Sequence, residues 1–291
     1  MTSFEKYLEK KFFSKETKKA YRCITENFLL SNPKANAYNY QDILNYMAEI
    51  SKHQISKATK QAKLTAIKKY YDYLVEEGIR EDHPCRTLNI KGIRKKGIIF
   101  TDLFTMAELE TLMEREERFI KMEETHKVIM SLLIYQALLP SEIIAIKTKH
   151  IDLEKGTIYA KGGRELIARH LELQPKQYRL LDEYIYKTRK KLLRKGKEND
   201  YLILNFRGKN YEGADGIGYL IETLKPCFPD RNLTTKSIRD SVISYWVNDR
   251  KIPLEQAQLL AGHRWISSTL RYRQTSIEEQ REILKKFHPM G

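Results

Sequence analysis

Apolar residues in the first hundred positions recur at helical spacing. Three segments show this pattern, at residues 14–32, 42–50 and 56–78. Ser14 and Ser56 are favourable N-cap residues, and Pro33 and Gly78 stop the first and third runs. The pattern predicts an all-helical N-terminal domain built from three amphipathic helices.

Beyond residue 100, helical periodicity alternates with one group of strand signals. Apolar runs at 151–153, 157–160 and 168–173 are separated by glycine-containing turns, which predicts a small antiparallel sheet. Helical patterns surround these strands, at 106–113, 128–136, 175–193, 217–227 and 233–247. The predicted fold class is therefore mostly α, with an all-helical N-terminal domain and an α+β C-terminal domain that contains a small antiparallel sheet.

A short basic segment, KGIRKKG at 91–97, separates the two patterns. Its glycines and its lack of apolar periodicity are typical of a linker between domains. Three parts are therefore predicted: a helical domain at 1–90, a basic linker at 91–100 and a second domain at 101–291. Arg94 and Lys95 are candidate DNA contacts in this linker, although an ordinary flexible hinge has the same composition.

The charge balance favours a polyanionic partner. The chain has 53 Lys and Arg against 38 Asp and Glu, a formal net charge of +15. Both domains share this excess, with 20 basic and 11 acidic side chains in residues 1–100 and 33 and 27 in residues 101–291. Two cationic surfaces suit nucleic acid held from two sides, because phosphate contacts dominate such affinities. A merely soluble basic protein would show the same balance.

Four lysines lie on the outer face of the predicted third helix: Lys57, Lys60, Lys63 and Lys68. We refer to them as the lysine ridge. Such a row is usually a solvated helix face, but it could also follow a DNA backbone. The ridge is therefore a candidate DNA-binding surface.

Cysteine usage and hydropathy indicate the compartment. The three cysteines are odd in number and far apart, which fits neither a disulfide framework nor a zinc cluster. No apolar run approaches the roughly 20 residues that span a bilayer. The N-terminus carries acidic residues and lacks the cleavage pattern of a signal peptide. We expect a cytoplasmic protein without a membrane partner.

The candidate chemistry centres on the segment LLAGHRWISSTLRYRQ at 259–274, which places His263 nine residues before Tyr272. Gly262 ends one predicted helix and Trp265 opens another, so His263 should lie at a helix–helix junction. Tyr272 could then project its phenol into the same space. Tyr272 alone does not identify a nucleophile, because it is one of 18 tyrosines and most tyrosines on amphipathic helices are half-buried core residues.

Two upstream segments offer cations for a phosphate. Lys236 and Arg239 are three residues apart on one predicted helix face, where they could clamp a phosphate together. Lys161 lies at the edge of a glycine-rich turn that would let its ammonium approach a phosphate closely. A lysine at such a turn is usually only solvated. The run KTRKKLLRKGK at 187–197 is most simply an exposed basic patch.

In this order, the parts of the chain resemble the tyrosine recombinase (phage integrase) family. Residues 1–90 are similar to its helical core-binding domain, and residues 101–291 to its catalytic domain. The family motifs fall on the sheet-turn lysine Lys161, the histidine-x-x-arginine box at Lys236 and Arg239, the glycine-histidine pair at Gly262-His263, and the nucleophile Tyr272. The resemblance implies a site-specific DNA recombinase with catalytic residues Tyr272, Arg239, His263, Lys161 and Lys236.

The chain departs from the family pattern at three positions. The family's first arginine aligns with Leu139, although Glu142 of the same motif is kept. Lys236 replaces the commoner histidine, a change that retains a donor. Asp240 replaces the histidine that often follows the box arginine. The first departure removes a phosphate clamp, whereas the other two adjust the site.

The missing arginine leaves more than one interpretation. If another cation compensates, the candidates are Arg164 beside the Lys161 turn and the basic patch at 187–197. If none does, the chain is a DNA-binding descendant of a recombinase with weak or no strand cleavage. A basic RNA-binding or scaffold protein is a third class, which predicts no preference for a repeated duplex site.

The resemblance implies covalent chemistry without a metal or a nucleotide cofactor. Tyr272 would attack a scissile phosphate and leave a 3′-phosphotyrosyl link and a free 5′-hydroxyl. Arg239 would hold the non-bridging oxygens, Lys236 and His263 would add donors or general-base help, and Lys161 would protonate the leaving oxygen.

The resemblance also implies partners. They are double-stranded DNA, three further copies of the chain in a homotetramer on two DNA sites, and accessory DNA-bending proteins. The tail at 277–287 could dock on a neighbouring protomer or fold back on its own domain. The implied biological reaction is integration or excision of a mobile element.

Overall fold

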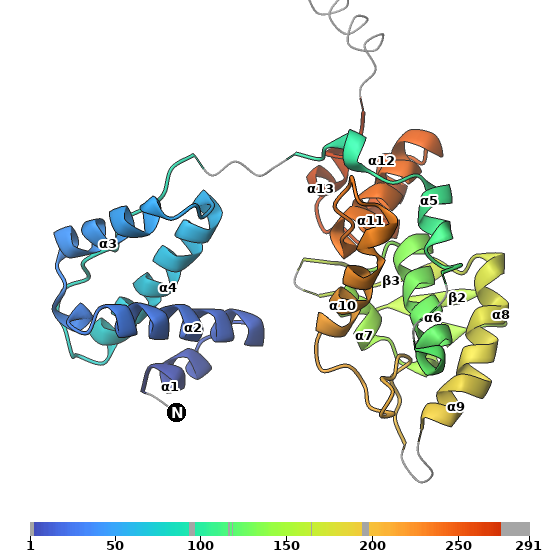
Figure 1. The fold of residues 1–291 in the computed structure, drawn as a ribbon, viewed down its shortest axis with the longest axis horizontal. Helices are drawn as coiled ribbons and strands as arrows, with labels where there is room; N and C mark the ends of the chain where they lie inside the picture. The colour runs from blue at the N-terminus through green and yellow to red at the C-terminus, as the bar shows by residue number, and fades with distance from the viewer. Residues whose placement is uncertain are drawn as a thin grey trace, which may run out of the picture. The chain divides into compact units, whose positions relative to one another are not determined.

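The computed structural model describes residues 3–92, 97–115, 117, 119–163, 165–193 and 198–274. The chain divides into two compact units, residues 1–96 and 97–291 (Figure 1). Each unit has its own hydrophobic core. The division falls within the segment where the sequence predicts a linker. Arg94 and Lys95 lie outside the described residues.

The first unit is all-helical in its described part. Its helices are α1 Ser3–Lys10, α2 Lys15–Ser31, α3 Tyr40–Lys52 and α4 Lys57–Glu76. Ser14 and Ser56 cap α2 and α4 as predicted, by accepting hydrogen bonds from Thr17 N and Thr59 N. Helix α4 packs against the other three helices. The sequence did not predict α1, because eight residues are too few to display a helical period.

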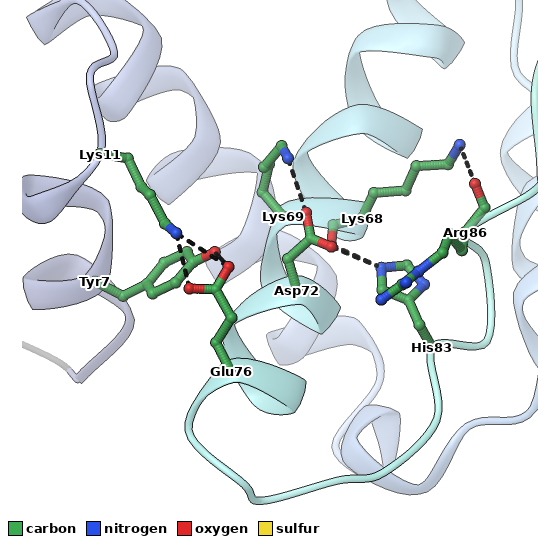
Figure 2. Close-up of polar contacts among 8 residues, drawn as sticks. All are labelled: Tyr7, Lys11, Lys68, Lys69, Asp72, Glu76, His83 and Arg86. Atoms are coloured by element: carbon green, nitrogen blue, oxygen red, sulfur yellow. Dashed lines mark hydrogen bonds and ion pairs between the residues drawn. The ribbon is translucent and has the colours of Figure 1, made fainter.

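Polar contacts anchor the C-terminal half of α4 (Figure 2). The Glu76 carboxylate accepts hydrogen bonds from Tyr7 Oη at 2.8 Å and from Lys11 Nζ at 2.7 Å, which ties α4 to the end of α1. On the loop side of α4, Lys68 Nζ donates to Arg86 O at 3.0 Å. The ammonium of this member of the lysine ridge therefore binds the chain's own backbone.

The second unit combines helices with one small sheet (Figure 1). Strands β1 Ile151–Asp152, β2 Thr157–Ala160 and β3 Arg169–Glu172 form an antiparallel sheet in the order β1-β2-β3, as predicted. The described helices are α5 Met106–Thr111, α6 Glu123–Tyr135, α7 Pro140–Ala145, α8 Pro175–Glu183, α9 Arg189–Leu192, α10 Asp215–Leu224, α11 Thr235–Ser244, α12 Leu254–Ala261 and α13 Ile266–Leu270. Every residue of α6 from Val128 to Ile134 is buried, and α11 packs against it.

Residues 194–197 of the basic patch predicted at 187–197 lie outside the described residues, and the described part of the patch is only partly exposed. A π-helical turn at Tyr184–Thr188 separates α8 from α9 and changes which side chains face inward. Arg189 is buried, and its guanidinium donates to Tyr201 O at 2.9 Å and to Asn199 O. This arginine therefore holds the loop after α9, and the prediction that it belongs to an exposed patch was wrong.

Cys23 and Cys227 are exposed and Cys85 is buried, and all three are free thiols. No helix in the described part of the chain is long and apolar enough to cross a membrane. Within the same residues, no three His, Cys, Asp or Glu side chains gather in a way that could hold a metal ion.

Candidate active site

Helix α11 carries the predicted arginine into the interior. Thr234 caps this helix by accepting a hydrogen bond from Ser237 N at 2.9 Å, which fixes where its first turn begins. Arg239, one turn later, is 5% exposed. Its Nη2 donates to Ala261 O at 2.6 Å and its Nη1 donates to Ala137 O. The guanidinium thus joins the end of α12 to the segment that precedes α7.

His263 lies at a helix junction, as the sequence predicts. Gly262 ends α12 with a φ of +70°, a left-handed conformation that glycine adopts without strain. The His263 ring then contacts Thr269 Oγ1 through Nδ1 at 2.9 Å. Burial lowers the pKa of His263 to about 4, and the neighbouring guanidiniums of Arg239 and Arg169 act in the same direction. The imidazole is therefore neutral at neutral pH.

Tyr272 lies just past the end of α13 and is 5% exposed. Its ring stacks against His263, with ring centroids 6.1 Å apart and planes 14° apart. Its hydroxyl donates to Asp240 Oδ1 at 2.6 Å. Burial raises the pKa of Tyr272, and the hydrogen bond to the Asp240 carboxylate raises it further. The phenol is therefore protonated at rest, with an acceptor already in contact.

Asp240 connects two of the predicted residues. Its Oδ2 pairs with Lys236 Nζ at 2.7 Å, while its Oδ1 accepts the Tyr272 hydrogen bond. The side chain of Lys236 is 76% exposed, so its ammonium lies at the solvent side of this carboxylate. The structure thus brings together Tyr272, His263, Arg239 and Lys236. The sequence interpretation treated Asp240 only as a departure from the family and missed its contact with the tyrosine.

Lys161 is exposed in the turn after β2, as predicted. No polar contact joins it to Tyr272 in the described residues. The hairpin that carries it nevertheless docks on the histidine segment, because Ile167 N donates to Gly262 O at 2.9 Å. Gly162 makes the tight turn possible, since a Cβ atom there would lie 2.4 Å from Ala168 N. The proposed general acid is therefore carried by an element that contacts the site.

The structure also reveals a charged residue that the sequence interpretation missed. Arg169, on β3, is 8% exposed, and its Nη1 lies 2.7 Å from Glu142 Oε1. Strand β3 alternates buried and exposed positions, and Arg169 shares the buried face with Leu171. An arginine on the apolar face of a predicted strand was the available signal, because a buried arginine needs a partner.

Comparisons with known proteins agree on one family. The family model described as "Phage integrase family" matches residues 103–279. The chain is 24% identical over 265 residues to tyrosine recombinase XerC of Halalkalibacterium halodurans, covering 89% of this chain and 85% of that protein. It is 26% identical to the putative tyrosine recombinase TTE1313 of Caldanaerobacter subterraneus subsp. tengcongensis, covering 98% and 97%.

Solved structures share the fold at lower sequence identity. A lambda integrase dimer bound to a COC′ core site matches with a TM-score of 0.67 and 14% identity, covering 93% of each chain. The Tn1549 transposon integrase in complex with circular intermediate DNA matches with a TM-score of 0.66 and 15% identity, covering 97% of each chain.

Proposed function

The chain belongs to the phage integrase family and is a tyrosine-type site-specific DNA recombinase, and on this premise we propose that Tyr272 is its nucleophile. The observation that carries this assignment is the placement of the Tyr272 hydroxyl. It lies buried with a carboxylate acceptor at 2.6 Å, against the neutral ring of His263 and in the field of Arg239. A buried tyrosine that served only packing would not need this set of charged neighbours.

The proposed cleavage step forms one bond and breaks one. Tyr272 Oη attacks the scissile phosphorus, and its proton passes to Asp240, which already accepts its hydrogen bond. The phosphorus–5′-oxygen bond breaks, and Lys161 protonates the leaving oxygen. Arg239 donates to the non-bridging oxygens as charge develops on them. His263 is neutral, so it contributes a ring N–H donor rather than a positive charge.

The second step reverses the first on a partner duplex. The free 5′-hydroxyl of the partner attacks the phosphotyrosine and gives its proton to Lys161, while Asp240 returns a proton to the Tyr272 oxygen, which leaves as the phenol. Because the phosphodiester energy is kept in the covalent link, rejoining needs no further energy source. We propose that four protomers carry out this exchange on two double-stranded DNA sites, and that the exchange integrates or excises a mobile element. The lysine ridge would hold the DNA backbone on the helical unit.

A suicide DNA substrate tests the assignment. A nick placed just 3′ of the scissile phosphate lets the short fragment that carries the free 5′-hydroxyl diffuse away, so the covalent protein–DNA adduct accumulates. We expect the unmodified protein to form the adduct and Tyr272→Phe to bind the same DNA without forming it. Tyr186→Phe is a matched control, because Tyr186 is an exposed tyrosine of the same unit. Adduct formation of normal yield by Tyr272→Phe would refute the nucleophile assignment.

One observation favours a second candidate function. The Leu139 side chain has no hydrogen-bond donor where the family has an arginine, and an uncompensated loss would leave a protein that binds DNA but cuts it poorly. The same suicide substrate separates the two functions. A wild-type protein that protects a specific duplex site in footprinting yet yields no adduct would be such a descendant.

A further inference from the structure

Leu139, which stands where the family has an arginine, and Arg169 both bind the carboxylate of Glu142. Leu139 lies at the start of α7, and its backbone N–H donates to Glu142 Oε2 at 2.9 Å. The same carboxylate holds Arg169, with Oε1 at 2.7 Å from Nη1 and Oε2 at 3.4 Å from Nη2. Residue 139 and the guanidinium on β3 therefore share one anchoring group.

Arg169 also lies against the segment that precedes His263. Its Nε donates to Leu260 O at 2.8 Å, and a Cβ atom at Gly262 would lie 2.2 Å from its Nη1. A larger residue at this position would displace the guanidinium from where it lies. Burial lowers the pKa of both Arg239 and His263, and the charge of Arg169 acts in the same direction on both, as expected for a nearby cation. Two guanidiniums, one from α11 and one from β3, thus flank the residue that precedes His263.

The contacts of Arg169 do not use all of its N–H donors. A guanidinium has five N–H groups. One is directed to Leu260 O, two go to the Glu142 carboxylate and one goes to Ile167 O. One Nη2 hydrogen therefore has no protein acceptor among the described residues. A buried, oriented guanidinium with a free donor is suited to bind a phosphate oxygen.

The strand register places Arg169 on the same hairpin as the proposed general acid. Arg169 pairs with Ala160 across the hairpin, and Ala160 directly precedes Lys161. Strands β2 and β3 thus carry the two residues, and the segment between them contacts the chain just before His263 through the hydrogen bond from Ile167 N to Gly262 O. Of the other candidates for a compensating cation, Arg164 and residues 194–197 lie outside the described residues. The guanidinium of Arg189 is bound to the carbonyls of the loop after α9.

We propose that Arg169 supplies the phosphate-binding guanidinium that Leu139 cannot, placed on strand β3 and oriented by Glu142. The proposal rests on the proposed strand-exchange function. A structural role alone gives a weaker account of the pair, because a buried ion pair contributes little net stability compared with apolar side chains of similar volume.

The first test compares two DNA substrates. One carries the normal scissile phosphate and the other a neutral methylphosphonate at the same position. We expect Arg169→Ala to lower the rate of adduct formation on phosphate about a hundredfold, the scale for loss of one transition-state donor. On methylphosphonate the loss should shrink to less than about tenfold, because the substrate no longer carries the charge that Arg169 binds. An equal loss on both substrates would contradict the proposal.

Two controls show whether Arg169→Ala slows cleavage through lost phosphate binding or through a folding defect. Arg169→Ala leaves Glu142 buried and unpaired, so the comparison is repeated with Arg169→Ala/Glu142→Gln, and thermal unfolding is measured for both. Arg189→Ala is the matched control, because it removes another buried arginine whose partners are backbone carbonyls. It should change stability and affect both substrates equally.

A rescue experiment tests the relocation itself. Adding Leu139→Arg to Arg169→Ala/Glu142→Gln should recover at least about tenfold of the lost rate, whereas Leu139→Arg alone should add little. In the unmodified protein Arg169 already binds the phosphate, so an arginine at position 139 would add no new phosphate contact. Strong activation by Leu139→Arg alone would show that the phosphate is missing a donor in the unmodified protein, which would overturn the proposal.

A binding measurement keeps this inference separate from the proposed function. In a Tyr272→Phe background no cleavage occurs, so affinity for the two DNA substrates can be compared directly. We expect phosphate to be preferred over methylphosphonate by about tenfold, and Arg169→Ala to remove most of that preference. A preference that persists in Arg169→Ala would refute the clamp. A wild-type protein that forms no adduct, but whose preference depends on Arg169, would refute only the proposed function.

Discussion

The hydroxyl of Tyr272 donates a hydrogen bond to Asp240, with 2.6 Å between Oη and Oδ1. The two residues are 32 positions apart, one just past α13 and the other on α11. A carboxylate at this distance stabilises the protonated phenol at rest, and in the proposed mechanism it receives the phenol proton during attack. If Tyr272 is the nucleophile, as we propose, the same contact keeps it protonated without substrate and supplies the acceptor for its proton during cleavage.

Asp240→Asn should separate these two effects. The amide carries no charge, so the pKa of Tyr272 should fall relative to the unmodified protein, because one of the causes that raise it is removed. Cleavage should nevertheless slow, by about a hundredfold, because the proton acceptor is lost. Ultraviolet titration of tyrosinate and suicide-substrate rates check the two parts. Faster cleavage by the variant would show that Asp240 restrains Tyr272 rather than acting as its base.

Lys161→Ala should slow cleavage of normal DNA and be rescued by a 5′-thio leaving group. A thiolate is a good leaving group and needs no proton, so loss of the general acid should then cost little. Lys155→Ala is a matched control, because Lys155 lies in the preceding turn of the same sheet. Failure of the sulfur substrate to rescue the variant would leave Lys161 with a positioning role only.

The pKa of His263 predicts a specific pH dependence of stability. The folded-state pKa is about 4, below the ordinary value of 6.5, so the unfolded chain binds a proton between these values that the folded chain does not. Stability from the neutral ring is fully present above pH 6.5 and declines as the pH falls toward 4.

His263→Asn should therefore flatten this part of the stability profile, as measured by urea unfolding at pH 7 and pH 5. Other groups titrate in the same range, so the difference between the variant and the unmodified protein is the relevant quantity. An imidazole that titrates by NMR near 6.5 in the folded protein would contradict the prediction.

Much of the site could be predicted because its signals are local. The glycine stop at Gly262, the spacing from His263 to Tyr272 and the cap at Thr234 each depend on neighbours within a few residues. Sequence reasoning missed the contacts that span the chain. Arg169 meets Glu142 across 27 residues, and no periodicity indicates which strand residue will meet which helix cap. The partner of Tyr272 was missed for the same reason.

The lysine ridge gives a prediction about the helical unit. Each lysine that binds a phosphate releases counterions, so removing one such lysine should make the slope of log affinity against log salt concentration less steep by about 0.9. Lys57→Ala, Lys60→Ala and Lys63→Ala should each show this change without altering sequence preference, because phosphate contacts carry no sequence information.

Lys68→Ala should behave differently from the rest of the ridge. Its ammonium donates a hydrogen bond to Arg86 O at 3.0 Å and so already binds the loop after α4 (Figure 2). We expect this variant to unfold at lower urea concentration while its salt slope stays unchanged. Salt titrations of duplex binding, with urea unfolding measured alongside, compare the four variants directly. A reduced slope for Lys68→Ala with unchanged stability would show that this lysine leaves the loop to bind DNA.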